Sequence, residues 1–229
     1  MMNFLALALT FGAQDPAEMA KKPFQARLTI ERFVKREDGV TLQSGTLSVR
    51  PGEALMFDAR PTRLLIREEA AVERRTGERT ARRWDLSKPE NFQPVDVWRM
   101  DADALRRMFQ VITDRPAETR EMPAAVVSAE GTPVAPVALK PGAALVVADG
   151  VDRAEGCARV FLVPRDPKLR DKIASIRLSV DRGTGLILRA VVDSTAQVLT
   201  LTLSDYREVA SLDDAVFELD LSNLKVEER

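Results

Sequence analysis

Apolar and polar residues alternate with a period of two along most of this 229-residue chain. Such alternation is typical of strands that bury one side and expose the other. A clear case is the first run, where Phe24, Ala26, Leu28 and Ile30 share one side. The same pattern predicts strands at residues 24–31, 40–50, 53–60, 64–74, 78–86, 143–148, 157–163, 175–181, 186–192, 199–204 and 217–221.

Turn-forming residues separate most of these runs. Asp38-Gly39, Pro51-Gly52 and Thr76-Gly77 fall between consecutive runs in the first half, and residues 182–185 do so in the second. Short turns of this kind join neighbouring strands as antiparallel hairpins. Roughly nine to eleven strands joined in this way predict one long antiparallel meander, curled because wide sheets twist.

One segment between the two halves has helical periodicity instead. Residues 101–112 begin with Asp101 and Asp103, either of which can cap the first turn of a helix. A stripe of four apolar residues follows at i, i+3, i+4 and i+7, formed by Leu105, Met108, Phe109 and Ile112. The stripe fits either ordinary packing against the sheet or a lid over its concave side.

The domain organisation is simple. An apolar run at residues 4–11, small residues at Gly12-Ala13 and a polar stretch after them predict an export signal at residues 1–13, the alternative being a buried first strand or helix. The run is too short for the ~20 residues that span a bilayer. No small-residue–cysteine pair follows it, so we expect an exported chain without a lipid anchor. Residues 14–229 are then a single β domain, with a proline-rich apolar loop at 116–142.

Composition narrows the chemistry. The chain has 34 Lys and Arg against 35 Asp and Glu, no histidine and one cysteine. This balance argues against nucleic acid as a partner, and the missing histidines remove the common catalytic triads and histidine-ligated metals. The adjacent carboxylates Glu68-Glu69 and Asp213-Asp214 would point to opposite sides if they lie in strands. We therefore expect no enzyme, no metal and no cofactor, and Cys157 as a small buried residue.

Several ordered motifs resemble one protein family. Residues 24–29 read Phe-Gln-Ala-Arg-Leu-Thr, Asp38-Gly39 follows, and residues 45–51 read Gly-Thr-Leu-Ser-Val-Arg-Pro. This order resembles the opening hairpin of the periplasmic outer-membrane lipoprotein carrier family (LolA-like). Residues 160–164, 173–181 and 212–217 are similar to later parts of that family, so the resemblance covers roughly residues 24–226.

The resemblance implies a mainly β fold, an incomplete, half-open antiparallel β-barrel with one or two helices over its mouth. It implies a periplasmic, monomeric carrier that shields lipoprotein acyl chains, or another lipid, during transfer to the outer membrane. An inner-membrane release complex and an outer-membrane acceptor would be its partners. The predicted cavity residues are Leu28, Ile30, Leu105, Met108, Phe109, Ile112, Leu178, Leu188 and Leu201.

The resemblance also assigns a role to Arg50, which precedes Pro51. The arginine of this pair is linked in the family to a latch on the closed lid. A guanidinium at the rim of a cavity can bridge several carbonyls, which we expect here from residues 96–112 or from the proline-rich loop. The same architecture also serves non-carrier lipid-binding and envelope-sensor modules, and this second function stays open.

Overall fold

The protein folds into one wide, curled β-sheet. The structure is a computed structural model that describes residues 22–35, 39–113 and 157–229. The signal at 1–13, the loop at 116–142 and the predicted strand at 143–148 lie outside these residues. The strands are β1 (Phe24–Val34), β2 (Val40–Arg50), β3 (Ala54–Ala59), β4 (Thr62–Arg67), β5 (Ala70–Arg75), β6 (Thr80–Asp85), β7 (Phe109–Thr113), β8 (Cys157–Pro164), β9 (Ile173–Asp181), β10 (Ile187–Ser194), β11 (Gln197–Glu208) and β12 (Lys225–Glu228).

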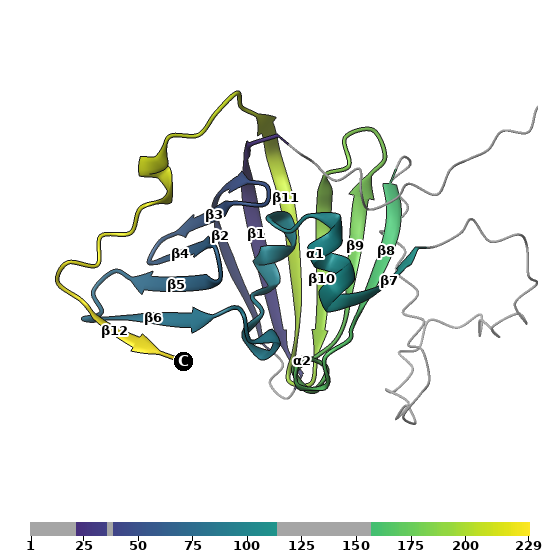
Figure 1. The fold of residues 1–229 in the computed structure, drawn as a ribbon, viewed down its shortest axis with the longest axis horizontal. Coiled ribbons are helices and arrows are strands. Elements are labelled where there is room, and N and C mark those ends of the chain that lie inside the picture. The colour runs from purple at the N-terminus through teal and green to yellow at the C-terminus, as the bar shows by residue number, and fades with distance from the viewer. Residues whose placement is uncertain (1–21, 36–38, 114–156) are drawn as a thin grey trace, which may run out of the picture.

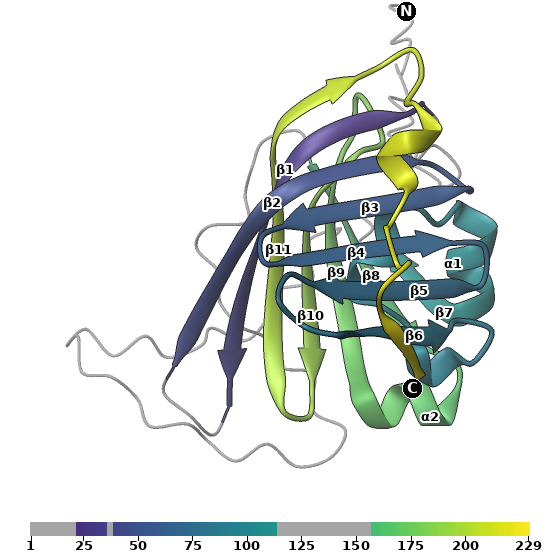
Figure 2. The same cartoon turned by 90° about the vertical axis from the view of Figure 1, so that its left-hand side faces the viewer.

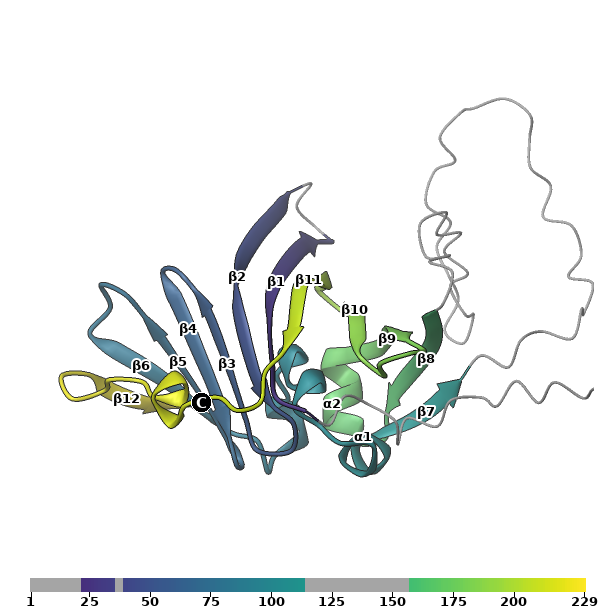
Figure 3. The same ribbon diagram turned by 90° about the horizontal axis from the view of Figure 1, so that it is seen from above.

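Two meanders meet at the pairing of β1 with β11. The strand order is β12-β6-β5-β4-β3-β2-β1-β11-β10-β9-β8-β7, and within the described residues every pair is antiparallel except β12–β6, which is parallel. The sheet curls without closing, so its two ends stay apart (Figures 1 and 3). The predicted fold class, a mainly β, half-open curled meander with few helices, is confirmed.

Short helical segments accompany the sheet. The α-helices are α1 (Ala102–Met108) and α2 (Pro167–Lys172), and the 3₁₀ helices are η2 (Pro89–Asn91), η3 (Pro94–Trp98) and η4 (Asp214–Phe217). Asp101 caps α1 as predicted, because its carboxylate accepts a hydrogen bond from the Ala104 amide at 2.6 Å. In the same way, Asp166 accepts from the amides of Lys168 and Leu169 at the start of α2, a helix that the periodicity does not predict.

The predicted helix at 101–112 is too long. The helix ends at Met108, and residues from Phe109 onward form β7 against β8. Residues 111–113 read Val-Ile-Thr, and β-branched residues favour a strand. The i+7 spacing therefore does not place Ile112 on the side that holds Leu105 and Phe109.

Two further expectations are wrong. The strand predicted at 64–74 is two strands, because Glu68 adopts a positive φ of 53° and turns the chain between β4 and β5. The strand predicted at 217–221 is absent, because Phe217 ends the η4 helix. Neither carboxylate pair thus lies in a strand: Glu68-Glu69 form a turn, and Asp213 caps η4.

The sheet has a concave face and an outer face, and a different chain segment covers each. Residues 89–109 pack their apolar side chains into the concave face, where the larger core lies. The segment after β11 crosses the outer face of β3 and β4 on its way to β12 (Figure 2). There Leu212 and Phe217 form a second, smaller core with Ala54 and Met56 of β3.

Candidate functional site

The concave face gathers apolar residues from both halves of the chain. Residues directly opposite one another in neighbouring strands share a face. Ile30 pairs with Leu201, Leu201 with Ala190, and Ala190 with Leu178. Leu28 lies two residues before Ile30 in β1, and so it faces the same way. The pairing therefore brings Leu28, Ile30, Leu178 and Leu201 together on one face, as the sequence predicts.

One end of this face is fully packed, and we call it the closed end. Trp98 of η3 donates a hydrogen bond from Nε1 to the carbonyl oxygen of Ile187 at 2.8 Å. The ring of Phe92 meets the ring of Phe109 edge-on, with centroids 5.3 Å apart. Leu105 and Phe109 are buried in the same core. The closed end is thus filled by the protein's own side chains.

The remaining predicted cavity residues divide into two groups. Met108 and Leu188 are partly buried and pack against the main core. Ile112 is different, because it is 46% exposed and pairs with Phe161 on the outer face of β7 and β8. Strand residues alternate between faces, so Phe109 and Val111 point inward while Ile112 points outward. The prediction that Ile112 lines the cavity is wrong.

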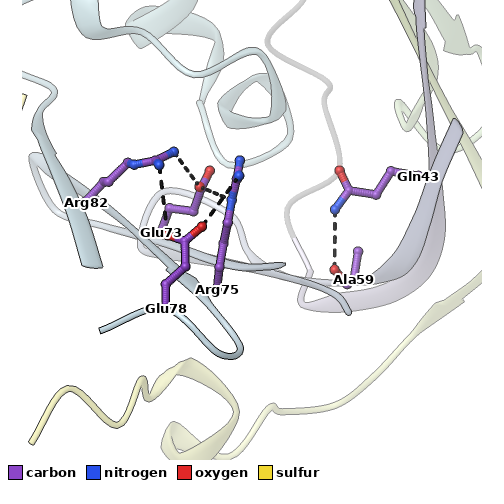
Figure 4. Close-up of polar contacts among 6 residues, drawn as sticks. All are labelled: Gln43, Ala59, Glu73, Arg75, Glu78 and Arg82. Carbon is purple, nitrogen blue, oxygen red and sulfur yellow. Dashed lines mark hydrogen bonds and ion pairs between the residues drawn. The ribbon is translucent and has the colours of Figure 1, made fainter. Parts of the chain in front are cut away.

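The other end of the concave face is open, and it holds a groove of about 560 Å³. Ile30 and Leu199 lie in this groove and are partly buried against the main core, so the apolar face continues into it. Gln43 donates from Nε2 to the carbonyl oxygen of Ala59 at 3.3 Å (Figure 4). We call this space the open-end groove. Its lining is Ile30, Arg32, Thr41, Leu42, Gln43, Ser44, Arg60, Pro61, Gln197 and Leu199.

A charged wall occupies the same face on β5 and β6. Glu73 pairs in register with the buried Leu64 of β4, and this places Glu73 on the concave face. Its carboxylate accepts a hydrogen bond from Arg75 Nε at 2.8 Å and lies 3.5 Å from Arg82 Nη1. Glu78 lies 3.9 Å from each of the same two arginines (Figure 4). Two arginines and two glutamates thus neutralise one another in this wall.

Arg50 has a partner other than the predicted one. It donates to Asp214 Oδ1 at 2.6 Å and to the carbonyl oxygen of Leu212, and its guanidinium lies over the ring of Phe217. The hydrogen bonds and the charge of Arg50 lower the pKa of Asp214 below its ordinary value. Arg50 thus holds the C-terminal segment on the outer face.

The predicted partner of Arg50 within residues 96–112 is therefore wrong, while the proline-rich loop lies outside the described residues. The connection to residues 96–112 is instead a backbone one. The amide of Gly52, in the turn after Arg50, donates to the carbonyl oxygen of Arg99 at 2.6 Å.

A second groove of about 430 Å³ lies at an irregularity between β1 and β11. Asp205 adopts a positive φ of 52° there, next to the register shift between Gln25 and Arg27. Arg27 and Arg207 both line this groove. Arg27 alternates with Leu28, so its side chain belongs to the outer face. Ser44 lines both this groove and the open-end groove.

Sequence reasoning missed the two arginines of the open-end groove, Arg32 and Arg60. Arg32 occupies the position that follows Ile30 in the inward-facing series of β1, where alternation predicts an apolar residue. That break in the pattern is the signal that could have found it. For Arg60, the following Pro61 indicates only a turn.

The described residues hold neither a membrane-spanning helix nor a cluster of metal ligands. No helix there is both long and apolar enough to span a bilayer. No cluster of three or more histidine, cysteine, aspartate or glutamate side chains there is arranged to hold a metal ion.

No family model and no curated protein matches the chain. Solved structures with a similar fold include a LolA superfamily protein from Nitrosomonas europaea, 10% identical with a TM-score of 0.48 over 91% of this chain and 96% of that one. A putative outer membrane lipoprotein-sorting protein domain from Vibrio parahaemolyticus is 9% identical, with a TM-score of 0.46 over 88% and 92%. The lipoprotein LppX from Mycobacterium tuberculosis is 11% identical, with a TM-score of 0.38 over 87% and 93%.

Proposed function

We propose that this protein binds acyl chains on the concave face of its half-open barrel and carries them through the periplasm to the outer membrane. The observation that supports this most directly is the open-end groove. Ile30 and Leu199 form an apolar floor there that continues into the main core. A soluble protein that leaves part of its inner apolar face accessible in a concave groove has the shape of a small-molecule site.

The energetics favour such a role. Moving an acyl chain out of water contributes about 0.8 kcal/mol per methylene group, so a lipoprotein tail needs a shield while it crosses the aqueous space. A curled sheet provides one, because its backbone groups bond to one another while its side chains present apolar surface. Residues 89–109 fill the closed end, and displacement of this segment would lengthen the groove for a longer or a second chain.

The carrier proposal includes a cellular setting. Residues 1–13 would direct export and would be removed, leaving a periplasmic monomer. A release complex at the inner membrane would load it, and an acceptor at the outer membrane would unload it. The transfer itself would need no catalytic residue, because differences in affinity along the route suffice.

The test has two measurements on the purified full-length protein. Native mass spectrometry should show a co-bound acyl lipid whose mass is lost after delipidation. The delipidated protein should then extract a triacylated lipoprotein from inner-membrane vesicles into the soluble fraction. Absence of both a bound lipid and any extraction would contradict the proposal.

A non-carrier lipid-binding or sensor module is the second candidate. The volume of the open-end groove, about 560 Å³, favours it, because this is the size of a site for one small ligand. Such a module would show a bound lipid in the mass spectrum but would extract no lipoprotein from vesicles. The two measurements therefore separate the two candidates.

A further inference from the structure

The open-end groove has an unbalanced charge. Arg32 of β1 and Arg60 of the β3–β4 turn both line it, and no carboxylate from the part of the chain that the structure describes does so. Its other polar side chains are uncharged hydrogen-bonding groups, namely Thr41, Gln43, Ser44 and Gln197. The groove therefore combines an apolar floor, hydrogen-bonding side chains and two positive charges.

The neighbouring charged wall shows why this imbalance is informative. There, Arg75 and Arg82 each lie within 4 Å of both Glu73 and Glu78, so their charges are matched. Neither Arg32 nor Arg60 has an ion-pair or hydrogen-bond partner among the described residues. Among the described residues, the arginines of the charged wall are thus matched by glutamates, while the two arginines of the open-end groove are not.

We propose that the open-end groove binds a single-chain amphiphile whose headgroup is a carboxylate or a phosphate. This inference rests on the proposed acyl-chain binding and specifies its ligand. The chain would lie on Ile30 and Leu199, and the anionic headgroup would lie between Arg32 and Arg60. Guanidinium groups suit this role, because their fixed donors match the oxygens of carboxylate and phosphate in pairs.

Both arginines are exposed at the rim of the groove, so their charges stay hydrated until a headgroup binds between them. A ligand with the same chain and a neutral headgroup would gain the apolar contacts alone. The two arginines would therefore determine which headgroup the groove prefers, while Ile30 and Leu199 would determine how tightly it binds the acyl chain.

The experiment measures displacement of a fluorescent fatty-acid probe from the full-length protein by four competitors of equal chain length. Palmitate and palmitoyl lysophosphatidylglycerol carry a negative charge, while methyl palmitate and monopalmitoylglycerol carry no charged group. We expect the charged competitors to bind about tenfold more tightly than their neutral counterparts. Raising the ionic strength from about 0.05 M to about 0.5 M should reduce this preference.

Variants assign the effect to its residues. Arg32→Gln and Arg60→Gln should each reduce the preference for charged competitors about threefold or more, and the double variant should abolish it. Arg27→Gln is the matched control, because Arg27 lies on the same strand but faces outward. It should leave the preference unchanged, and all variants should keep the melting temperature of the wild type.

The outcomes separate this inference from the function on which it rests. Equal binding of charged and neutral competitors to the wild type would overturn the anionic subsite and leave acyl-chain binding in place. Failure of every competitor would overturn both. Preference for only one of the two charged headgroups would support the subsite and identify its ligand.

Discussion

The two faces of the curled sheet are both covered by a chain segment, but in different ways. On the concave face, residues 89–109 insert Trp98, Leu105 and Phe109 into the main core, and all three are buried. On the outer face, the segment after β11 rests on a small apolar cluster and is tied down by Arg50. We call residues 89–109 the inner cover, which is part of the core. We call the segment after β11 the outer strap, which is held on the sheet at a few points.

This difference shows where the protein can be altered without unfolding it. Removing an inner contact leaves a cavity in a close-packed core. Removing an outer contact exposes only a small cluster, and surface ion pairs contribute little to stability. A ligand that replaced the inner cover would therefore need to provide comparable apolar contact, which an acyl chain can do.

The largest expected effect tests the inner cover. Phe109→Ala should lower the free energy of unfolding by about 3–5 kcal/mol, because Phe109 is fully buried and packs against Phe92. Ile112→Ala is the matched control on the outward face of the same strand, with an expected loss below about 1 kcal/mol. Urea denaturation of both variants measures this difference. Equal losses would show that the two residues do not differ in burial.

A smaller effect tests how tightly the strands approach on the concave side. Gly45 lies opposite Leu28, and a Cβ atom at this position would overlap Ala59 and the carbonyl oxygen of Asp58. Gly45→Ala should therefore destabilise the protein by about 1–3 kcal/mol. Gly39→Ala is the control, since a Cβ atom there meets no other atom within 4 Å. A wild-type denaturation midpoint for Gly45→Ala would contradict this close approach.

The outer strap should respond more weakly. Arg50→Leu removes the contacts to Asp214, Leu212 and Phe217, and we expect a loss of about 1 kcal/mol in stability. Hydrogen exchange should become faster in residues 212–217 while residues 89–109 stay protected. Faster exchange in residues 89–109 instead would return Arg50 to the role of a latch on the inner cover.

The smallest expected effect is that acid weakens the attachment of the outer strap to the sheet. Arg50 lowers the pKa of Asp214 in the folded protein, so the ion pair stabilises the folded state above the ordinary aspartate pKa of about 3.9. This contribution is lost as the pH falls through the lowered pKa of the folded state. Below about pH 4 the protection factors of residues 212–217, which compare their exchange with that of an unfolded peptide at the same pH, should fall in the wild type, and Asp214→Asn should remove that acid-dependent step. An identical acid response in both proteins would show that another group is responsible.

The positions of most strands could be predicted from the sequence, because they depend on the local alternation of apolar and polar residues. The prediction for residues 40–50 coincides with β2, and the pairing of Ile30 with Leu201 places both on the predicted face. The turn at Glu68 could not be read in this way. It uses a residue type that rarely adopts positive φ, so it carries no turn signal.

The candidate site was only partly predictable, because it depends on contacts between distant segments. Leu28, Leu105 and Leu201 follow from periodicity, since each lies in an apolar series of its own element. The partner of Arg50 lies more than 160 residues away in sequence, and local spacing cannot identify it. Ile30 is only partly buried while Leu28 two residues earlier is buried, and periodicity places both on one face without distinguishing them.

The central claim is that acyl chains bind on the concave face at its open end, and two adjacent residues test it. Ile30 faces the groove and Glu31 faces outward on the same strand, so Ile30→Gln and Glu31→Gln place the same side chain on opposite faces. The measurement is the affinity of the full-length protein for a fluorescent fatty-acid probe. We predict that Ile30→Gln weakens binding about tenfold, because it puts an amide into the apolar floor, while Glu31→Gln binds as the wild type does. Wild-type affinity in Ile30→Gln, or an equal loss in both variants, would contradict the account.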